Sequence, residues 1–221
     1  MSAGVEHGTV RIEGPGGEAL DCLRAEPAGG ERASPGGGVV LAPPCPALGD
    51  GARVIAERLA RGGHVVLAPD LEGRPGDRPA VAALEAAAAA LCGDPAVDEE
   101  RVAAVGCGLG GTLAFLLGCH SRRLAAVVDV SGPVTYAALD PLHPVQPLEM
   151  ALNLSCPLLA VFGERDPGIL PADFEALRER LAAFARPALV EVVPGVALES
   201  DDVWTRTLAF LADPHRPFPP A

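Results

Sequence analysis

Short apolar runs alternate with longer helix-like segments along most of the chain. The runs are rich in Val, Leu and Ala and are too short for helices, so we interpret them as strands buried on both faces. They lie at 39–42, 64–68, 101–105, 124–130, 157–162 and 188–193. Predicted helices lie at 51–59, 79–91, 112–119, 172–184 and 202–211. Strand, helix and strand in succession predict parallel crossovers and therefore an α/β fold.

Two partly alternating segments precede these runs. Residues 9–13 and 19–25 are separated by Gly-Pro-Gly-Gly at 14–17, which favours an antiparallel hairpin of edge strands. The glycine- and proline-rich stretch at 27–38 and the stretch at 93–100 are predicted to be loops.

The length of 221 residues and the 49% hydrophobic content fit one domain, 1–221, with one sizeable core. Residues 131–155 form the only long irregular region, and we expect them to contain a short helix and to cover the site as a lid. The proline-rich tail at 213–221 is predicted to be loose.

The charge of the chain excludes some classes of partner. The formal net charge is −12, and the arginines are scattered singly or in pairs, so there is no basic stripe to neutralise phosphates. Nucleic acid and anionic membranes are therefore not expected as partners.

The cysteines and the apolar runs bear on metal binding and on the cellular compartment. Six cysteines show no paired spacing of the disulfide or zinc kind, which predicts free thiols and no metal site. No apolar run has the length of a membrane span, and residues 1–9 lack the apolar core of a secretory signal. We therefore expect a soluble cytoplasmic protein with no cofactor.

The stretch from Arg101 to Thr112 carries the main chemical signal, because an apolar run leads through several glycines into a helix. This order resembles a nucleophile elbow, G-x-nucleophile-x-G, in which the reactive side chain sits on a strained turn between strand and helix. The pattern falls on residues 106–110 and places Gly108, which has no side chain, at the nucleophile position. A register in which Cys107 is the nucleophile would put Val105 and Leu109 where very small residues are needed.

Five motifs in order give the chain a specific resemblance. They lie at 39–48, 65–74, 94–111, 124–132 and 162–166. With them the chain resembles the dienelactone hydrolase family of the α/β-hydrolase fold. The resemblance implies a mostly parallel eight-stranded sheet with helices on both faces, and a Cys, Asp and His triad that opens lactones or esters of small carboxylic acids.

Carried over residue by residue, the resemblance retains Asp166 as the triad acid. The family cysteine falls on Gly108, and the family histidine falls on Leu198. The His-Glu pair that the family has after its third strand falls on Pro43-Pro44. Without a nucleophile or a base, the acyl-enzyme route has no first step.

Other parts of the site remain chemically competent. The resemblance implies an oxyanion hole made by the backbone N–H groups of Leu109 and Cys45, and it places Arg74 near the substrate carboxylate. Each of these residues also has a structural interpretation. Gly108 can simply relieve a positive φ, Asp166 can cap a turn, and Arg74 can pair with a nearby surface carboxylate.

The first hypothesis is a protein of this type that has lost hydrolysis. It binds a small carboxylate, lactone or ester, or promotes a non-hydrolytic step such as cyclisation or isomerisation. The second is a working esterase or lactonase with Cys107 as nucleophile, His143 as base and Asp166 as orienting acid. A third is a purely structural partner of a catalytic relative. Monomer and homodimer both stay open, and so does the question of whether the protein is an enzyme.

Overall fold

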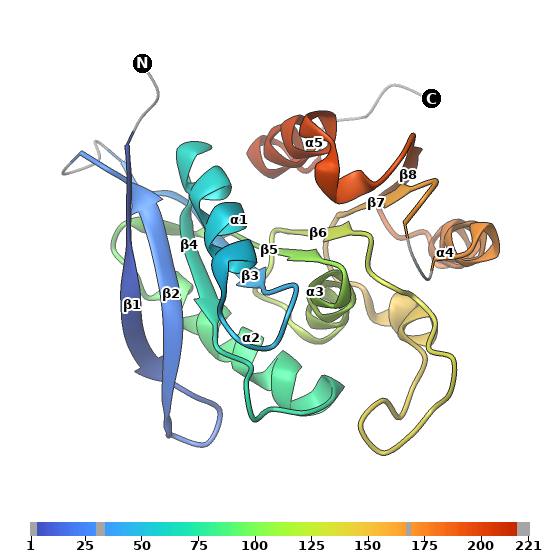
Figure 1. Ribbon diagram of the computed structural model, residues 1–221, viewed down its shortest axis with the longest axis horizontal. Helices are drawn as coiled ribbons and strands as arrows, with labels where there is room; N and C mark the ends of the chain where they lie inside the picture. The colour runs from blue at the N-terminus through green and yellow to red at the C-terminus, as the bar shows by residue number, and fades with distance from the viewer. Residues whose placement is uncertain (1–3, 30–33, 167–168, 216–221) are drawn as a thin grey trace.

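The computed structural model describes residues 4–29, 34–166 and 169–215, and it contains one eight-stranded sheet (Figure 1). The strand order is β1-β2-β4-β3-β5-β6-β7-β8. The strands are β1 (Val5–Glu13), β2 (Ala19–Pro27), β3 (Gly36–Ala42), β4 (Val65–Pro69), β5 (Val97–Cys107), β6 (Ala126–Val130), β7 (Leu158–Gly163) and β8 (Ala188–Val193). From β4 to β8 all neighbours pair in parallel, while β1 and β2 are antiparallel additions. The predicted α/β-hydrolase sheet is therefore confirmed.

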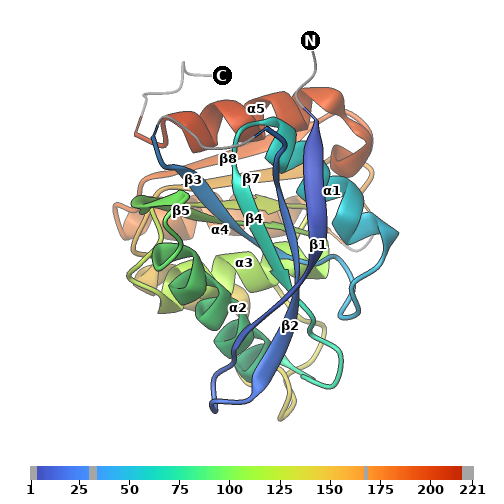
Figure 2. The same ribbon diagram turned by 90° about the vertical axis from the view of Figure 1, so that its left-hand side faces the viewer.

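Helices cover both faces of this sheet, as Figures 1 and 2 show. The helices are α1 (Asp50–Arg61), α2 (Asp77–Cys92), α3 (Leu109–His120), α4 (Pro171–Ala183) and α5 (Asp201–Ala212). Helices α1 and α5 pack on one face, and α2, α3 and α4 pack on the other. Two shorter 3-10 helices are η1 (Pro147–Asn153) and η2 (Ala197–Glu199).

Side chains of the central strand β5 point alternately to the two faces of the sheet. Val102 and Ala104 contact the core under α2 and α3, whereas Ala103, Val105 and Cys107 contact the core under α1 and α5. This alternation follows from the two-residue period of a strand, and it explains why the run is apolar throughout rather than amphipathic. The same period decides that Cys107 points toward α1 and α5.

Several features of the sheet differ from the sequence prediction. Of the two hairpin strands, only β1 lies at an edge of the sheet, because β2 pairs with β4 as well as with β1. β5 begins at Val97, inside the stretch predicted as a loop, and β3 begins at Gly36 and pairs with it there. The glycines at this pairing serve close packing, since a Cβ on Gly38 would lie 2.8 Å from Val97 Cγ1.

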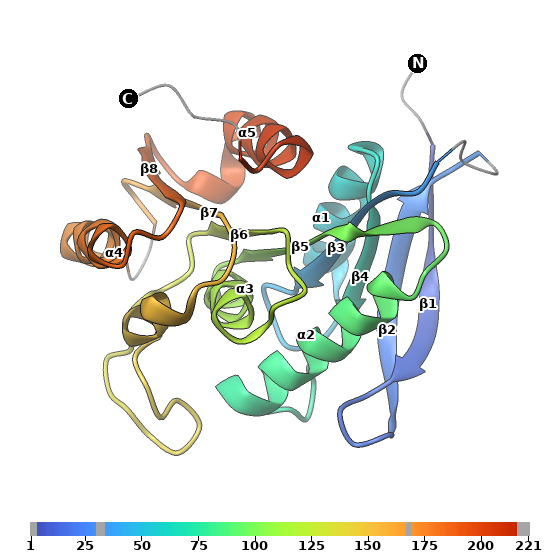
Figure 3. The same cartoon turned by 180° about the vertical axis from the view of Figure 1, so that it is seen from behind.

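The region at 131–155 is irregular apart from η1, as predicted. Its loop at 137–145 is closed by the Gln146 amide, which accepts from the Tyr136 N–H and donates to the Tyr136 carbonyl at 2.9 Å. Figure 3 shows this yellow segment beside α2. Residues 216–221 of the predicted loose tail lie outside the described part. No helix within the described residues is long and apolar enough to cross a membrane.

A buried carboxyl group lies beneath the start of α3. Asp129, on β6, is 0% exposed, and its Oδ1 accepts the Gly132 N–H at 2.8 Å. Its Oδ2 has no hydrogen-bond partner among the described residues. Burial disfavours the charged form and raises the pKa of Asp129 from 3.8 to about 8. The folded protein therefore holds this carboxyl protonated well above the pH at which the unfolded chain releases the proton.

We expect Asp129→Asn to remove a component of the pH dependence of stability. Between pH 4 and pH 8 the folded state binds a proton that the unfolded state has lost. The free energy of unfolding of the native protein therefore falls as the pH rises, by roughly 1 kcal/mol per pH unit from this group. Urea unfolding at pH 5 and pH 7.5 should show a smaller loss for the variant. Parallel losses in both proteins would contradict this assignment.

Candidate functional site

The turn between β5 and α3 has the geometry of an elbow centred on Gly108. Gly108 has φ 57° and ψ −129°, a conformation that disfavours residues with a Cβ. A Cβ on Gly106 would collide with the Gly110 carbonyl, and one on Gly110 would lie 2.6 Å from the Pro43 oxygen. The turn thus combines a positive φ at Gly108 with close backbone approaches at Gly106 and Gly110.

The position of the expected nucleophile is open, whereas the neighbouring thiol is enclosed. A Cβ on Gly108 would meet no heavy atom within 4 Å. Cys107 is 0% exposed, and burial together with the nearby Asp129 raises the pKa of its thiol far above the ordinary value. A thiol in such surroundings stays protonated and inert.

Asp166 is engaged by three donors. Its carboxylate accepts hydrogen bonds from the Ser131 hydroxyl at 2.5 Å, the Gly163 N–H at 2.5 Å and the Ala197 N–H at 3.1 Å. The side chain is buried, and the bonds join the ends of β6 and β7 to the start of η2. Asp166 therefore holds three loops together, whatever else it does.

Leu198, which the sequence resemblance aligns with the family histidine, lies in η2 and is 36% exposed. Its carbonyl accepts the indole N–H of Trp204 at 3.4 Å. The residue thus offers backbone structure and an apolar side chain, but no group that transfers a proton.

A cavity of about 570 Å³ lies over the start of α3. Its lining comprises residues 43–46 and 71–77 with Ala80, Leu109, Thr112, Leu113, Tyr136 and His143. The cavity therefore joins the loop after β3, the loop after β4, the elbow helix and the irregular region at 131–155, which we call the lid. Its size is that of a small-molecule site.

Two of the residues that line this cavity, Cys45 and Leu109, have backbone N–H groups of chemical interest. The Leu109 N–H is the first of α3, and neither it nor the Cys45 N–H has an acceptor among the residues that the structure describes. The first N–H groups of a helix lack internal partners and carry the positive end of its dipole, so they favour a carbonyl oxygen or an anion.

Arg74 also lines the cavity, but it already has an ionic partner. Its guanidinium pairs with Glu18, from the turn of the β1–β2 hairpin, at 2.9 Å. The sequence alternative named a nearby surface carboxylate, and the partner instead comes from 56 residues away. A ligand carboxylate would have to share or displace Glu18.

A polar cluster on the cavity wall joins α2 to the lid. Asp77 Oδ1 accepts the Tyr136 hydroxyl at 2.8 Å and lies 3.0 Å from His143 Nδ1. The Tyr136 and His143 rings are in contact, with centroids 4.6 Å apart. Burial and Asp77 both raise the pKa of the Tyr136 phenol, which stays a hydrogen-bond donor. Sequence reasoning found His143 but missed its two partners, since an acid at a helix start is typical of helix capping.

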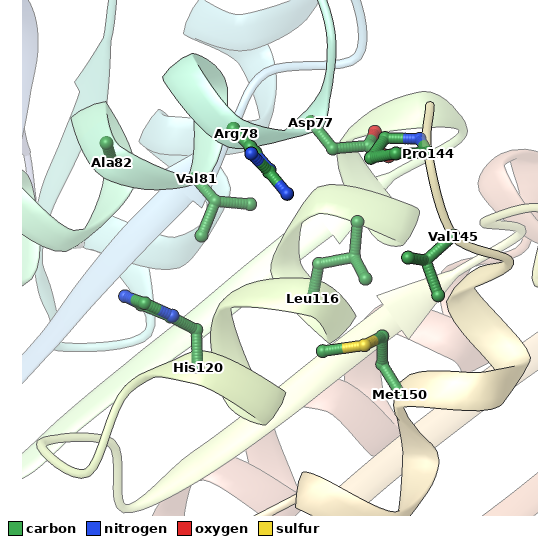
Figure 4. A pocket seen from close by; sticks show the side chains of 9 residues that line it. All are labelled: Asp77, Arg78, Val81, Ala82, Leu116, His120, Pro144, Val145 and Met150. Atoms are coloured by element: carbon green, nitrogen blue, oxygen red, sulfur yellow. The ribbon is translucent and has the colours of Figure 1, made fainter. Parts of the chain in front are cut away.

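A second cavity of about 390 Å³ adjoins the first and shares Asp77 with it (Figure 4). Figure 4 shows the Arg78 and His120 side chains among Val81, Leu116 and Met150. Its lining is mostly apolar, and it lies between α2, the C-terminal end of α3 and the lid. Within the described residues, no group of three or more His, Cys, Asp or Glu side chains could hold a metal ion.

Comparison with known proteins gives a consistent picture. The model of the "Dienelactone hydrolase family" matches residues 24–197. A protein of Escherichia coli K12 named "Putative carboxymethylenebutenolidase" is 28% identical over 189 residues, which cover 71% of this chain and 69% of that protein. A Salmonella typhimurium protein of the same name is also 28% identical, over 194 residues that cover 72% of this chain and 71% of that protein.

Solved structures share the fold. The structure titled "Putative Dienelactone Hydrolase" from Klebsiella pneumoniae superposes with a TM-score of 0.83 at 23% identity, covering 95% of this chain and 99% of that one. A dienelactone hydrolase-like promiscuous phosphotriesterase from metagenomic libraries gives a TM-score of 0.77 at 21% identity, with 95% and 98% covered.

We expect Asp166→Ala to destabilise the protein by roughly 3 kcal/mol, because it leaves three buried donors without an acceptor. A suitable control is Asp98→Ala, since Asp98 also accepts a backbone N–H, but through an exposed hydrogen bond at the start of β5. That control should cost less than about 1 kcal/mol. Urea unfolding measures both, and equal small costs would argue against the structural role of Asp166.

Proposed function

The chain belongs to the dienelactone hydrolase family, and from that premise we propose that it binds a small lactone, ester or carboxylate and promotes a non-hydrolytic step. The step is an isomerisation or a cyclisation, and no acyl-enzyme forms. The names of the relatives point to a butenolide, a five-membered unsaturated lactone, as the type of ligand.

One observation carries the proposal. The cavity retains two unpartnered N–H groups, at Leu109 and Cys45, while the nucleophile position beside them is Gly108. The donors can bind a carbonyl oxygen and stabilise negative charge that develops on it. No side chain at Gly108 can attack the carbonyl carbon, so stabilised charge leads to an enolate rather than to a tetrahedral adduct.

The remaining route to hydrolysis would use Cys107. That thiol packs against the core under α1 and α5, and burial raises its pKa. Attack would require the chain to expose the thiol and to remove its proton, with His143 as the base. His143 lines the cavity, which Cys107 does not, and its carboxylate partner is Asp77 rather than the Asp166 that this route requires. These contacts favour the non-hydrolytic proposal.

Thiol labelling and an ester assay test this choice. In the native protein, we expect iodoacetamide to modify the exposed Cys45 and to leave Cys107 unmodified, as read by peptide mass spectrometry. The rate of p-nitrophenyl acetate hydrolysis should equal the buffer background. Fast labelling of Cys107 that abolishes a measurable hydrolysis rate would overturn the proposal in favour of the esterase alternative.

The role of the Leu109 N–H can be tested by a pair of substitutions. Leu109→Pro removes the donor at the first helical position, where proline is well tolerated, and Leu109→Ala keeps it. The Leu109 side chain is 60% exposed, so neither change should disturb the core. Titration with the butenolide α-angelica lactone should give about tenfold weaker binding for Leu109→Pro than for Leu109→Ala. Equal affinities would exclude this donor from the ligand site.

A further inference from the structure

The lid presents His143 to the cavity in a fixed position. Asp140 Oδ1 accepts the N–H groups of Leu142 and His143 at 2.8 and 2.7 Å, which folds the loop into a tight turn. The Leu142 carbonyl accepts the Asp77 N–H at 3.0 Å. Gly76 makes this docking possible, because a Cβ there would lie 2.6 Å from the same carbonyl oxygen.

The partners of His143 decide which ring nitrogen is available. Asp77 is buried, and it lies in the first turn of α2 with Oδ1 3.0 Å from His143 Nδ1. A proton on Nδ1 directed at this carboxylate leaves the lone pair on Nε2, at the opposite edge of the ring. The Tyr136 hydroxyl donates to the same Asp77 oxygen and so fixes the carboxylate.

The cavity thus combines a base with a site for a carbonyl oxygen. His143 lines one part of the wall, and Leu109 with its free N–H lines another. A base near the carbon next to a carbonyl, together with donors for the oxygen, is the arrangement that proton abstraction requires. It needs no nucleophile, which agrees with glycine at position 108.

We propose that His143 is the general base and acid of a 1,3-proton shift in an unsaturated lactone, with Asp77 and Tyr136 as positioning residues. This inference rests on the proposed function, since it uses the same bound carbonyl. Nε2 takes a proton from the ring carbon next to the carbonyl, and the C–H electron pair moves into the ring to give a dienolate. The imidazolium then returns the proton to the far end of the dienolate, so the product is an isomer of the substrate.

The step can be followed with α-angelica lactone in D₂O. Proton NMR separates the substrate from its conjugated isomer and reports deuterium at the ring carbon that bears the methyl group. We expect the native protein to accelerate isomerisation with deuterium incorporation. His143→Ala should lower the rate by about 100-fold or more while the lactone still binds. Added imidazole should restore part of the rate, since it can occupy the vacated space.

Matched variants separate chemistry from structure. His7→Ala removes a histidine that also faces a carboxylate, Glu57 at 3.5 Å, but on β1 and away from the cavity. It should keep the native rate and gain nothing from imidazole beyond the solution background. Asp77→Asn should lower the maximal rate more than it weakens lactone binding, because Asp77 acts through His143.

The possible outcomes distinguish a failure of the role of His143 from a failure of the proposed function. Binding without isomerisation, or a rate that survives His143→Ala, would overturn the role of His143 and leave the proposed function standing. Absence of lactone binding, or conversion to the open-chain acid, would overturn the proposed function itself. Loss of the rate in His143→Ala with rescue by imidazole would support both.

Discussion

The close approach of backbone segments at the elbow is the constraint on which the rest of the site depends. The end of β5, the start of α3 and the loop after β3 meet so tightly that Gly106 and Gly110 have no room for a Cβ. This contact places the N-terminus of α3 beside Cys45 and leaves the Leu109 N–H without an internal acceptor. Next to this contact, Cys107 points into the core and Gly108 lies at the open turn.

Two buried carboxyl groups, those of Asp129 and Asp166, bind the backbone segment next to this turn. Asp129 Oδ1 lies under Gly111 and binds the Gly132 N–H, and Asp166 binds the hydroxyl of Ser131. Ser131 has φ 61°, an uncommon conformation for a residue with a side chain, so these contacts stabilise a strained segment next to the elbow. The contacts of Asp166 therefore give this residue a structural role that does not depend on any catalytic one.

The sequence predicted the repeating strands and helices because their signals are local. An apolar run bounded by glycine or proline, such as the one at 39–42, specifies a strand without reference to its neighbours. Gly38 lies in a stretch that the sequence predicts as a loop, but it is part of β3, because its role depends on packing against Val97, far along the chain. The pairing of Asp77 with His143, 66 residues apart, could not be predicted either, since only the docking of the lid on α2 brings them together.

The most direct test of the account is a crystal structure of the protein with γ-valerolactone, a saturated lactone that cannot shift a double bond. The account predicts an intact ring with its carbonyl oxygen within hydrogen-bond distance of the Leu109 and Cys45 nitrogens. It also predicts His143 Nε2 beside the carbon next to that carbonyl. An opened lactone joined to a cysteine sulfur, or a lactone found only in the cavity of Figure 4, would contradict it.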